Sequence, residues 1–272
     1  CTVEHPTLET SNIMMKHPAI QLIAATGGPG VVTAVLSSGR RGIGAGAGNP
    51  PALVDETADL RKAAEDIVNG CTFDNNLPCI AEKEIVAVDS VVDELMNYMI
   101  NEQGCYPISK EEQDALTAVV LKDGKLNRKC VGRDAKTLLG MIGITVPDNI
   151  RCITFEGPKE HPLIATELMM PILGVVRAKD FDDAVEQAVW LEHGNRHSAH
   201  IHSKNVDNIT KYAKAIDTAI LVKNGPSYAA LGFGGEGFCT FTIASRTGEG
   251  LTSASTFTKR RRCVMTDSLC IR

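Results

Sequence analysis

Apolar residues along the chain fall into short runs that alternate with amphipathic stretches. Short, nearly continuous apolar runs are typical of strands buried on both faces of a parallel sheet. The longer stretches repeat their apolar positions at helical spacing, so the alternation predicts an α/β fold. We expect strands at residues 20–25, 41–45, 52–54, 84–88, 151–155, 172–177, 198–203, 220–223 and 263–267. We expect helices at residues 31–38, 59–69, 91–100, 110–120, 134–142, 181–193 and 206–216.

Capping residues mark the ends of several predicted helices. Ser109 precedes one of them and Glu112 follows three residues later, which is the spacing of a capping box. Asp59 is a candidate N-cap for the helix that follows it, and we expect Gly70 to end that helix. The stretch 121–134 is polar and irregular, so it predicts a loop.

The composition is that of an ordinary soluble globular protein. The 272 residues are 43% apolar and 22% charged, enough for one large domain or two smaller ones. The net charge of -5 and the lack of a long basic stripe argue against nucleic acid as a partner. The basic run 259–262 is interpreted as a solvated strand edge. No apolar run approaches the roughly 20 residues that span a bilayer, so we expect no membrane partner.

Nine cysteines are scattered along the chain, and none form a C-x-x-C pair. Their number is odd, and reduced thiols in a cytoplasmic protein fit this pattern better than a disulfide framework. A zinc site needs clustered ligands at characteristic spacings. The sequence therefore predicts no metal.

A glycine-rich turn follows the first predicted strand. Gly27, Gly28 and Gly30 lie between that strand and a helix, where backbone N–H groups and the helix N-terminus favour a bound phosphate. The turn lacks the G-x-G-x-x-G fingerprint, so a plain tight turn is an equal alternative. A second glycine-dense segment, 232–237, either allows close approach of a ligand or forms a surface loop.

Cys79 has the local context of a nucleophile. It follows the polar, proline-containing residues 75–78 and precedes an apolar stretch. Such a position can expose a thiol and lower its pKa, and the thiolate is the reactive form. A buried structural cysteine is the alternative, and among nine cysteines the local context alone does not select Cys79.

Four histidines lie close together in the sequence: His193, His197, His200 and His202. They fit either a metal site or an acid–base group, but no carboxylate or thiolate partner is fixed for a metal. Ordinary hydrogen-bonded histidine accounts for most of them. We retain His197 alone as a candidate acid–base residue.

Taken together, these residues resemble the CoA-acylating branch of the aldehyde dehydrogenase superfamily. The similarity runs in order along nearly the full length and corresponds to the C-terminal part of the family fold. The ending and the stretch 161–171 are most similar to members that act on propionaldehyde in 1,2-propanediol utilisation. The matching stretches are ATGGPGVV (25–32), IGAGAGNPPALVDETAD (43–59), FDNNLPCIAEKE (73–84), HPLIATELMMP (161–171), RHSAHIHS (196–203), VKNGPS (222–227), LGFGGEG (231–237) and RRCVMTDSLCIR (261–272).

The start of the chain fits a partial match. Residues 1–4 read like the interior of a strand, and no initiator methionine precedes them. A processed or truncated product, one piece of a longer polypeptide, and an arbitrary starting point are all open alternatives.

The resemblance implies an α/β aldehyde dehydrogenase fold with three parts. Residues 1–72 are expected to be the C-terminal part of a Rossmann-like NAD-binding domain, and residues 73–250 the α/β catalytic domain. Residues 251–272 are expected to be an oligomerisation tail whose strand pairs with a neighbouring subunit. A homo-oligomer follows from this expectation.

The resemblance also implies roles for individual residues. Cys79 matches the catalytic cysteine, and His197 is expected to assist thiol deprotonation. Glu167 matches the glutamate that holds the nicotinamide ribose. At Ala45, hydrolytic members carry a glutamate that activates water, and the alanine suits a thioester that survives until coenzyme A arrives. The expected cofactor-binding residues are Thr26, Gly27, Gly28, Gly30, Ala45, Gly46 and Glu167.

The implied reaction is the NAD-dependent oxidation of a short-chain aldehyde, propionaldehyde above all, to its acyl-CoA. It passes through a thiohemiacetal and a thioester on Cys79, with coenzyme A as co-substrate. The expected location is the cytoplasm or the interior of a bacterial microcompartment. A hydrolytic aldehyde dehydrogenase that gives free acid is one alternative, and a non-catalytic fragment is the other.

Overall fold

The computed structural model of the chain describes residues 2–235 and 252–267. Its strands are β1 (Leu22–Thr26), β2 (Arg41–Ala45), β3 (Pro51–Val54), β4 (Glu84–Val88), β5 (Cys105–Pro107), β6 (Leu121–Lys122), β7 (Lys125–Leu126), β8 (Cys152–Glu156), β9 (Ile172–Ala178), β10 (Ser198–His202) and β11 (Ile220–Lys223). The α-helices are α1 (Leu8–Lys16), α2 (Pro29–Leu36), α3 (Leu60–Thr72), α4 (Asp89–Glu102), α5 (Lys110–Val120), α6 (Ala135–Gly140), α7 (Phe181–Leu191) and α8 (Val206–Ile216). Short 3₁₀ turns are η1 (Phe73–Asn76), η2 (Ser227–Leu231) and η3 (Ala254–Phe257).

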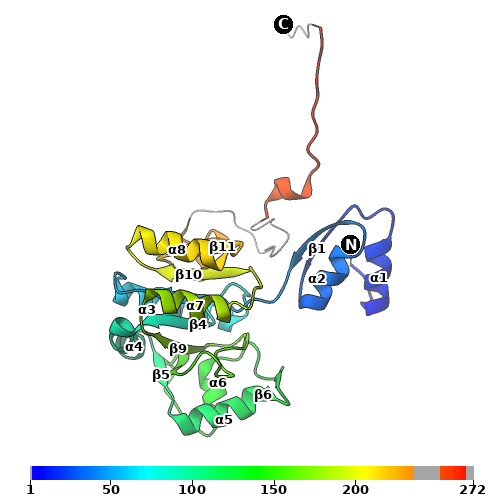
Figure 1. Cartoon of the computed structure of the whole chain (residues 1–272). Helices are drawn as coiled ribbons and strands as arrows, with labels where there is room; N and C mark the ends of the chain where they lie inside the picture. The colour runs from blue at the N-terminus through cyan, green and yellow to red at the C-terminus, as the bar shows by residue number, and fades with distance from the viewer. Residues whose placement is uncertain (1, 236–251, 268–272) are drawn as a thin grey trace.

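A seven-stranded parallel sheet forms the body of the molecule, in the order β11-β10-β3-β4-β9-β8-β5 (Figure 1). Every residue of β3 and β4 is buried. Helices cover both faces of such a sheet, which is why its central strands are almost entirely apolar in sequence. The expected α/β class is therefore confirmed.

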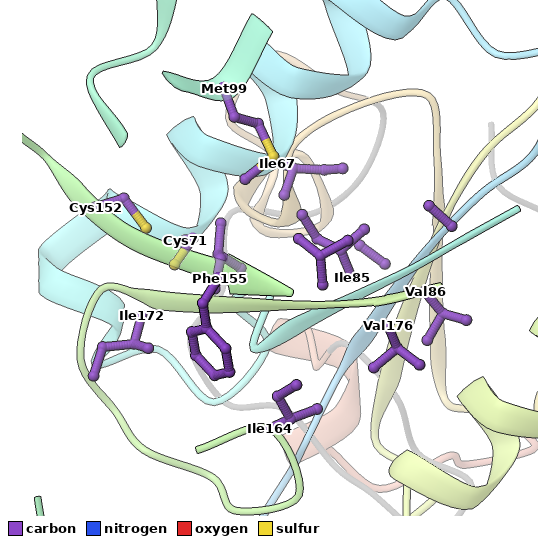
Figure 2. Packing of buried hydrophobic residues seen from close by; sticks show 14 of the residues in the cluster. Ile67, Cys71, Ile85, Val86, Met99, Cys152, Phe155, Ile164, Ile172 and Val176 are labelled. Atoms are coloured by element: carbon purple, nitrogen blue, oxygen red, sulfur yellow. The ribbon is translucent and has the colours of Figure 1, made fainter. Parts of the chain in front are cut away.

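Helices pack on the sheet in two groups. Helices α3 and α4 pack against each other and against β8, β9 and β5, whereas α7 packs on β3, β4 and β9 with α8 beside it (Figure 1). Figure 2 shows the core on the α3 side, where Ile67 of α3 lies near Met99 of α4 and Cys71 of α3 lies near Cys152 of β8. The loops that join strands to helices in this body carry the candidate site.

The N-terminal segment forms a smaller, separate unit. Strands β1 and β2 pair in parallel as a two-stranded sheet, with α2 packed on both. Helix α1 has no buried residue, and the buried core of the large sheet begins at Ala52. Strand β3 belongs to the large sheet and α3 packs against that sheet, so the division between the two sheets falls between β2 and β3. The expected domain boundary at residue 72 stays a prediction.

The structure corrects several sequence-based expectations. Residues 263–267 form no strand, and among residues 252–267 only η3 is regular. Helix α3 continues past Gly70 to Thr72, although Asp59 does cap its start. Helix α1 and strand β5 were not predicted, and the segment predicted as a loop contains the antiparallel pair of β6 and β7. In the part of the chain that the structure describes, every helix is too short or too polar to cross a membrane.

Candidate active site

The candidate nucleophile follows a tightly wound turn between α3 and β4. Asp74, Asn75 and Asn76 have φ angles of 47°, 50° and 65°. Left-handed backbone costs a residue with a side chain roughly 1–2 kcal/mol, so the turn needs support from its surroundings. The Asn76 amide supplies it by donating to the carbonyl oxygens of Cys71 and Glu82, both at 2.9 Å.

Cys79 is half-buried in a pocket of about 610 Å³. Burial raises the pKa of its thiol, the positive charge of Lys83 lowers it, and Glu167 raises it. The Cys79 and Ile80 backbone N–H groups also favour the thiolate, though less strongly. The pocket is largely apolar and is lined by Thr26, Phe73, Asp74, Leu77, Pro78, Cys79, Ile80, Met169 and Leu231.

Gly48 connects three of the expected site residues. A Cβ atom added to Gly48 would lie 2.9 Å from the carbonyl oxygen of Cys79 and 3.1 Å from Cγ and Nδ1 of His197. Burial raises the pKa of the Glu167 carboxyl, the positive charge of Lys83 lowers it, and the backbone N–H of Gly48 lowers it further. The structure therefore brings Cys79, His197 and Glu167 together around one glycine.

His197 is neutral in this environment. Burial, with a smaller effect of Lys83, lowers the pKa of its imidazole to about 4. Its backbone N–H donates to Glu192 Oε1 at 2.9 Å, and Nδ1 lies 2.9 Å from Ser198 Oγ. Nε2 is buried without a hydrogen-bond partner in the described part of the chain. The neutral ring has a nitrogen free to accept a proton, but a pKa of about 4 makes it a weaker base at neutral pH than an ordinary histidine, so acting as a general base would require a nearby negative charge or added solvent to raise its pKa.

The glycine-rich turn joins β1 to α2 beside the same pocket. Thr26 lines the pocket and pairs in register with Ala45, while the Gly27 N–H donates to the Ala45 carbonyl at 3.0 Å. Gly28 is the N-cap of α2, and no side chain caps that helix. A Cβ atom added at Gly28 or Gly30 would meet nothing within 4 Å. An open, uncapped helix start of this kind fits a cofactor phosphate.

The other three histidines lie outside this constellation. His193 Nε2 lies 2.9 Å from the carbonyl oxygen of Ala165. His200 and His202 are buried on β10, where burial is the main cause that lowers the pKa of each to about 3. Among the residues placed by the structure, no three histidine, cysteine or acidic side chains are grouped as metal ligands would be.

The structure describes only part of the glycine-dense segment 232–237. Gly232 to Gly235 are described, whereas residues 236 and 237 of this segment lie outside the described residues. Phe233 is exposed and its ring packs edge-on against Tyr228, with centroids 6.0 Å apart.

Sequence reasoning missed three residues that shape the site. Lys83, Glu82 and Gly48 are all buried or enclosed near Cys79. The Glu82 carboxylate accepts a hydrogen bond of 2.8 Å from the Ser227 N–H, which connects the segment after Cys79 to η2. For Glu82 and Lys83 the available signal was their position directly before the predicted buried strand 84–88, where a charged side chain needs a specific partner.

Comparison with known proteins gives the family of the chain. Residues 2–254 match the aldehyde dehydrogenase family. The propanal dehydrogenase (CoA-propanoylating) of Citrobacter freundii is 50% identical over 272 residues, which are 100% of this chain and 59% of that protein.

Solved structures agree with this match. A propionaldehyde dehydrogenase from the Clostridium phytofermentans fucose utilisation bacterial microcompartment superposes with a TM-score of 0.97 and 81% identity, covering 100% of this chain and 62% of that one. A Rhodopseudomonas palustris propionaldehyde dehydrogenase, solved with bound CoA and an acylated cysteine, gives a TM-score of 0.93 and 55% identity, covering 96% of this chain and 60% of that one. The chain thus spans about three fifths of the length of these relatives. It belongs to the aldehyde dehydrogenase family and has the α/β fold of its CoA-acylating members.

Proposed function

We propose that this chain carries the catalytic residues of an NAD-dependent, CoA-acylating aldehyde dehydrogenase. The proposed substrate is a short-chain aldehyde, propionaldehyde above all, and the product is its acyl-CoA. The observation that carries this proposal is the arrangement around Gly48, which lies against the carbonyl oxygen of the thiol-bearing Cys79 and against the ring of the neutral His197. The relatives named above, which act on propanal, support the choice of aldehyde.

Two variants of the Clostridium phytofermentans enzyme support the assignment of the pair. That enzyme has been solved with alanine in place of one cysteine and with alanine in place of one histidine. The two substituted residues are separated along that chain by as many positions as Cys79 and His197 are along this one. We therefore assign the nucleophile to Cys79 and the acid–base role to His197.

In the proposed first half-reaction, the Cys79 thiolate adds to the aldehyde carbon. The carbonyl oxygen becomes an oxyanion, which the Cys79 backbone N–H stabilises. NAD, when bound, would accept the hydride that leaves the thiohemiacetal carbon, and the acyl group would remain on Cys79 as a thioester. Glu167 is proposed to hold the nicotinamide ribose, and the remaining cofactor contacts are proposed for Thr26, Gly27, Gly28, Gly30, Ala45 and Gly46.

In the second half-reaction, coenzyme A takes the acyl group. The unpaired Nε2 of neutral His197 accepts the proton of the incoming thiol. The resulting thiolate attacks the thioester carbon, and the Cys79 thiolate leaves as acyl-CoA forms. Ala45 offers no carboxylate to activate water, so transfer to coenzyme A competes well with hydrolysis.

An assay of product formation with and without coenzyme A tests this proposal. The whole polypeptide, incubated with NAD and propionaldehyde alone, should form a propionyl adduct on Cys79 that intact-mass and peptide mass spectrometry detect. Addition of coenzyme A should discharge the adduct as propionyl-CoA. Release of free acid at the same rate without coenzyme A would favour the hydrolytic alternative, and the absence of any adduct would favour a non-catalytic fragment.

The assembly of the protein is a further part of the proposal. We propose a homo-oligomer in which residues 251–272 act as the oligomerisation tail, next to a catalytic part at 73–250 and a cofactor-binding part at 1–72. In Figure 1 the described end of this tail extends away from the large sheet, which suits pairing with another subunit. The microcompartment origin of one similar enzyme supports a location in the cytoplasm or within such a compartment.

A further inference from the structure

Lys83 is an unusual charged residue for its position. It lies between Cys79 and the start of β4 and is only 4% exposed. Among the buried residues that the structure describes, it is the one lysine or arginine. A buried cation is costly unless it is paired and hydrogen-bonded, so its contacts indicate what it does.

The Lys83 ammonium donates hydrogen bonds to three oxygen atoms of the turn that precedes the nucleophile. It reaches Asn76 Oδ1 at 2.6 Å, the Asn76 carbonyl at 3.0 Å and the Pro78 carbonyl at 3.3 Å. Three acceptors match the three hydrogens of a protonated amine. Two of these bonds hold Asn76, the last of the left-handed residues, and so help to keep the turn in its strained form.

The third contact acts directly on the nucleophile. The Pro78 carbonyl belongs to the peptide bond whose nitrogen is that of Cys79, and it also accepts a bond from the Ala81 N–H at 3.0 Å. No cis peptide bond occurs in the described residues, so the carbonyl and the Cys79 N–H point in opposite directions. By fixing the carbonyl, Lys83 also fixes the direction of the N–H that is proposed to stabilise the oxyanion.

The charge of Lys83 reaches the other site residues as well. It lowers the pKa of the Cys79 thiol and of the Glu167 carboxyl, and it contributes to the neutral state of His197. Burial lowers the pKa of Lys83 itself, and Glu167 above all, then Cys71, Cys79 and Glu84, opposes that effect when these groups are ionised.

We propose that Lys83 is a positioning residue for the nucleophile: its buried ammonium holds the Pro78–Cys79 peptide and keeps a positive charge beside the Cys79 thiol. This inference rests on the proposed function, because it gives Lys83 a role only in relation to Cys79. It adds a residue that prepares the thiolate and orients the oxyanion donor without touching the substrate.

The pH dependence of Cys79 alkylation tests this role. In the whole polypeptide, the rate of iodoacetamide reaction at Cys79 is followed by peptide mass spectrometry from pH 6 to pH 10. Lys83→Met removes the charge and the donors, whereas Lys83→Gln removes the charge but keeps an N–H donor group. Lys211→Met, which removes a surface lysine paired with Asp182, is the matched control.

Both Lys83 variants should alkylate about tenfold more slowly at pH 7 than the unchanged protein, and the difference should close as the pH rises. The control should show the unchanged profile. Circular dichroism confirms folding of each variant, and Lys83→Gln decides the case if Lys83→Met does not fold. An unchanged alkylation profile in a folded Lys83 variant would overturn the proposal.

The outcome is separable from that of the proposed reaction. Alkylation reports the thiolate of Cys79 whether or not an acyl adduct forms with propionaldehyde. An unchanged alkylation profile in the Lys83 variants, together with normal acyl transfer, would therefore overturn only the role proposed for Lys83. The expected slowing of alkylation in the Lys83 variants, without any acyl adduct from propionaldehyde, would overturn the proposed function. It would leave the electrostatic coupling between Lys83 and Cys79 in place.

Discussion

The imidazole of His197 packs directly against Gly48, so closely that a single methyl group at Gly48 would lie 3.1 Å from the ring. The same methyl group would lie 2.9 Å from the carbonyl oxygen of Cys79. Both neighbours are held by surrounding structure, since the His197 N–H is bonded to Glu192 and Cys79 follows a braced turn. Gly48 therefore separates His197 from Cys79, and any larger residue at this position would displace one of the two.

Gly48→Ala should lower acyl-CoA formation by about tenfold to a hundredfold, because displacements near 1 Å at a catalytic pair have effects of this order. The measurement is the steady-state rate in the whole polypeptide, beside its thermal unfolding. Gly140→Ala is the matched control, since an added Cβ there meets nothing within 4 Å. Full activity in the folded Gly48 variant would show that this contact does not set the geometry.

Cys79→Ser should abolish aldehyde oxidation, with a loss of at least about a thousandfold, while the fold remains. A serine hydroxyl is far less ionised near neutral pH than a thiol, so it is a poor nucleophile here. The assay follows NADH formation with propionaldehyde and coenzyme A. Circular dichroism and thermal unfolding of the variant serve as the control for folding. Retained activity in the Cys79 variant would exclude this residue as the nucleophile.

Ala45→Glu should increase the share of free acid among the products. A carboxylate near the thioester can act as a general base for water. Ala45 is buried, so burial should raise the pKa of the new carboxyl and the effect should grow with pH. The ratio of acid to acyl-CoA is measured at fixed coenzyme A from pH 6 to pH 9. Ala45→Gln fills similar space without a base, and an equal ratio in both variants would contradict the idea.

Much of the fold could be predicted from local pattern. Strands β4 and β11 and helices α5 and α8 occupy the predicted residues, because each is a short apolar run or a well-capped amphipathic stretch. The Ser109 capping box forms as its spacing indicates. These elements carry their own signals, which tertiary contacts reinforce.

The errors arise where a distant partner decides the structure. Residues 263–267 have strand-like sequence, but a strand needs a neighbouring strand to pair with, and the described chain provides none there. Gly70 looks like a helix stop, yet it lies within α3 against the Glu82 carboxylate, at a distance that leaves no room for a Cβ atom. Lys83 was overlooked because a buried lysine that donates hydrogen bonds to a turn cannot be distinguished from a surface lysine by sequence alone.

Three buried histidines should make stability depend on pH. Burial lowers the pKa of His197 to about 4 and those of His200 and His202 to about 3, from an ordinary 6.5. Below pH 6.5 the unfolded chain binds protons at these rings and the folded chain does not. The free energy of unfolding therefore decreases as the pH is lowered below 6.5, by about 1.4 kcal/mol per pH unit for each histidine.

Glu82 opposes this trend within a limited range. Its pKa is raised to about 8 by burial, so the folded chain keeps a proton that the unfolded chain releases above pH 4.5. Glu82 therefore increases the free energy of unfolding as the pH falls from 8 to 4.5, and its contribution stays constant below pH 4.5. Burial also raises the pKa of Glu84, which acts in the same direction. We expect the steepest loss of stability just below pH 4.5.

His200→Leu tests the histidine contribution. His200 is fully buried, so leucine fills an interior position and removes the ring that the unfolded chain protonates below pH 6.5. Urea midpoints measured at pH 7, 5 and 4 should fall less in the variant than in the unchanged protein. The expected difference is about 1.4 kcal/mol per pH unit below 6.5. Parallel pH curves for the two proteins would mean that His200 binds its proton equally well in the folded chain.

The small N-terminal unit should be the least protected regular part of this chain. Its sheet has two strands, α1 buries no residue, and it contributes nothing to the core of the large sheet. Its exposed apolar residues include Leu8, Ile13, Met14, Val31 and Leu36. A two-stranded unit with so little burial opens at a low free energy, whereas central strands open only with global unfolding.

Native-state hydrogen exchange on the 272-residue chain measures this difference directly. Amides of β1 and β2 should exchange at least about a hundredfold faster than those of β3 and β4, corresponding to opening free energies that differ by more than about 2.7 kcal/mol. Strand β3 is the internal comparison, because it lies only a few residues beyond β2 and yet pairs with β4 and β10. The experiment is done at a concentration where sedimentation shows a monomer, since association would cover the apolar residues of the small unit. Protection of β1 equal to that of β4 in such a monomer would contradict the separation of the two sheets into units of different stability.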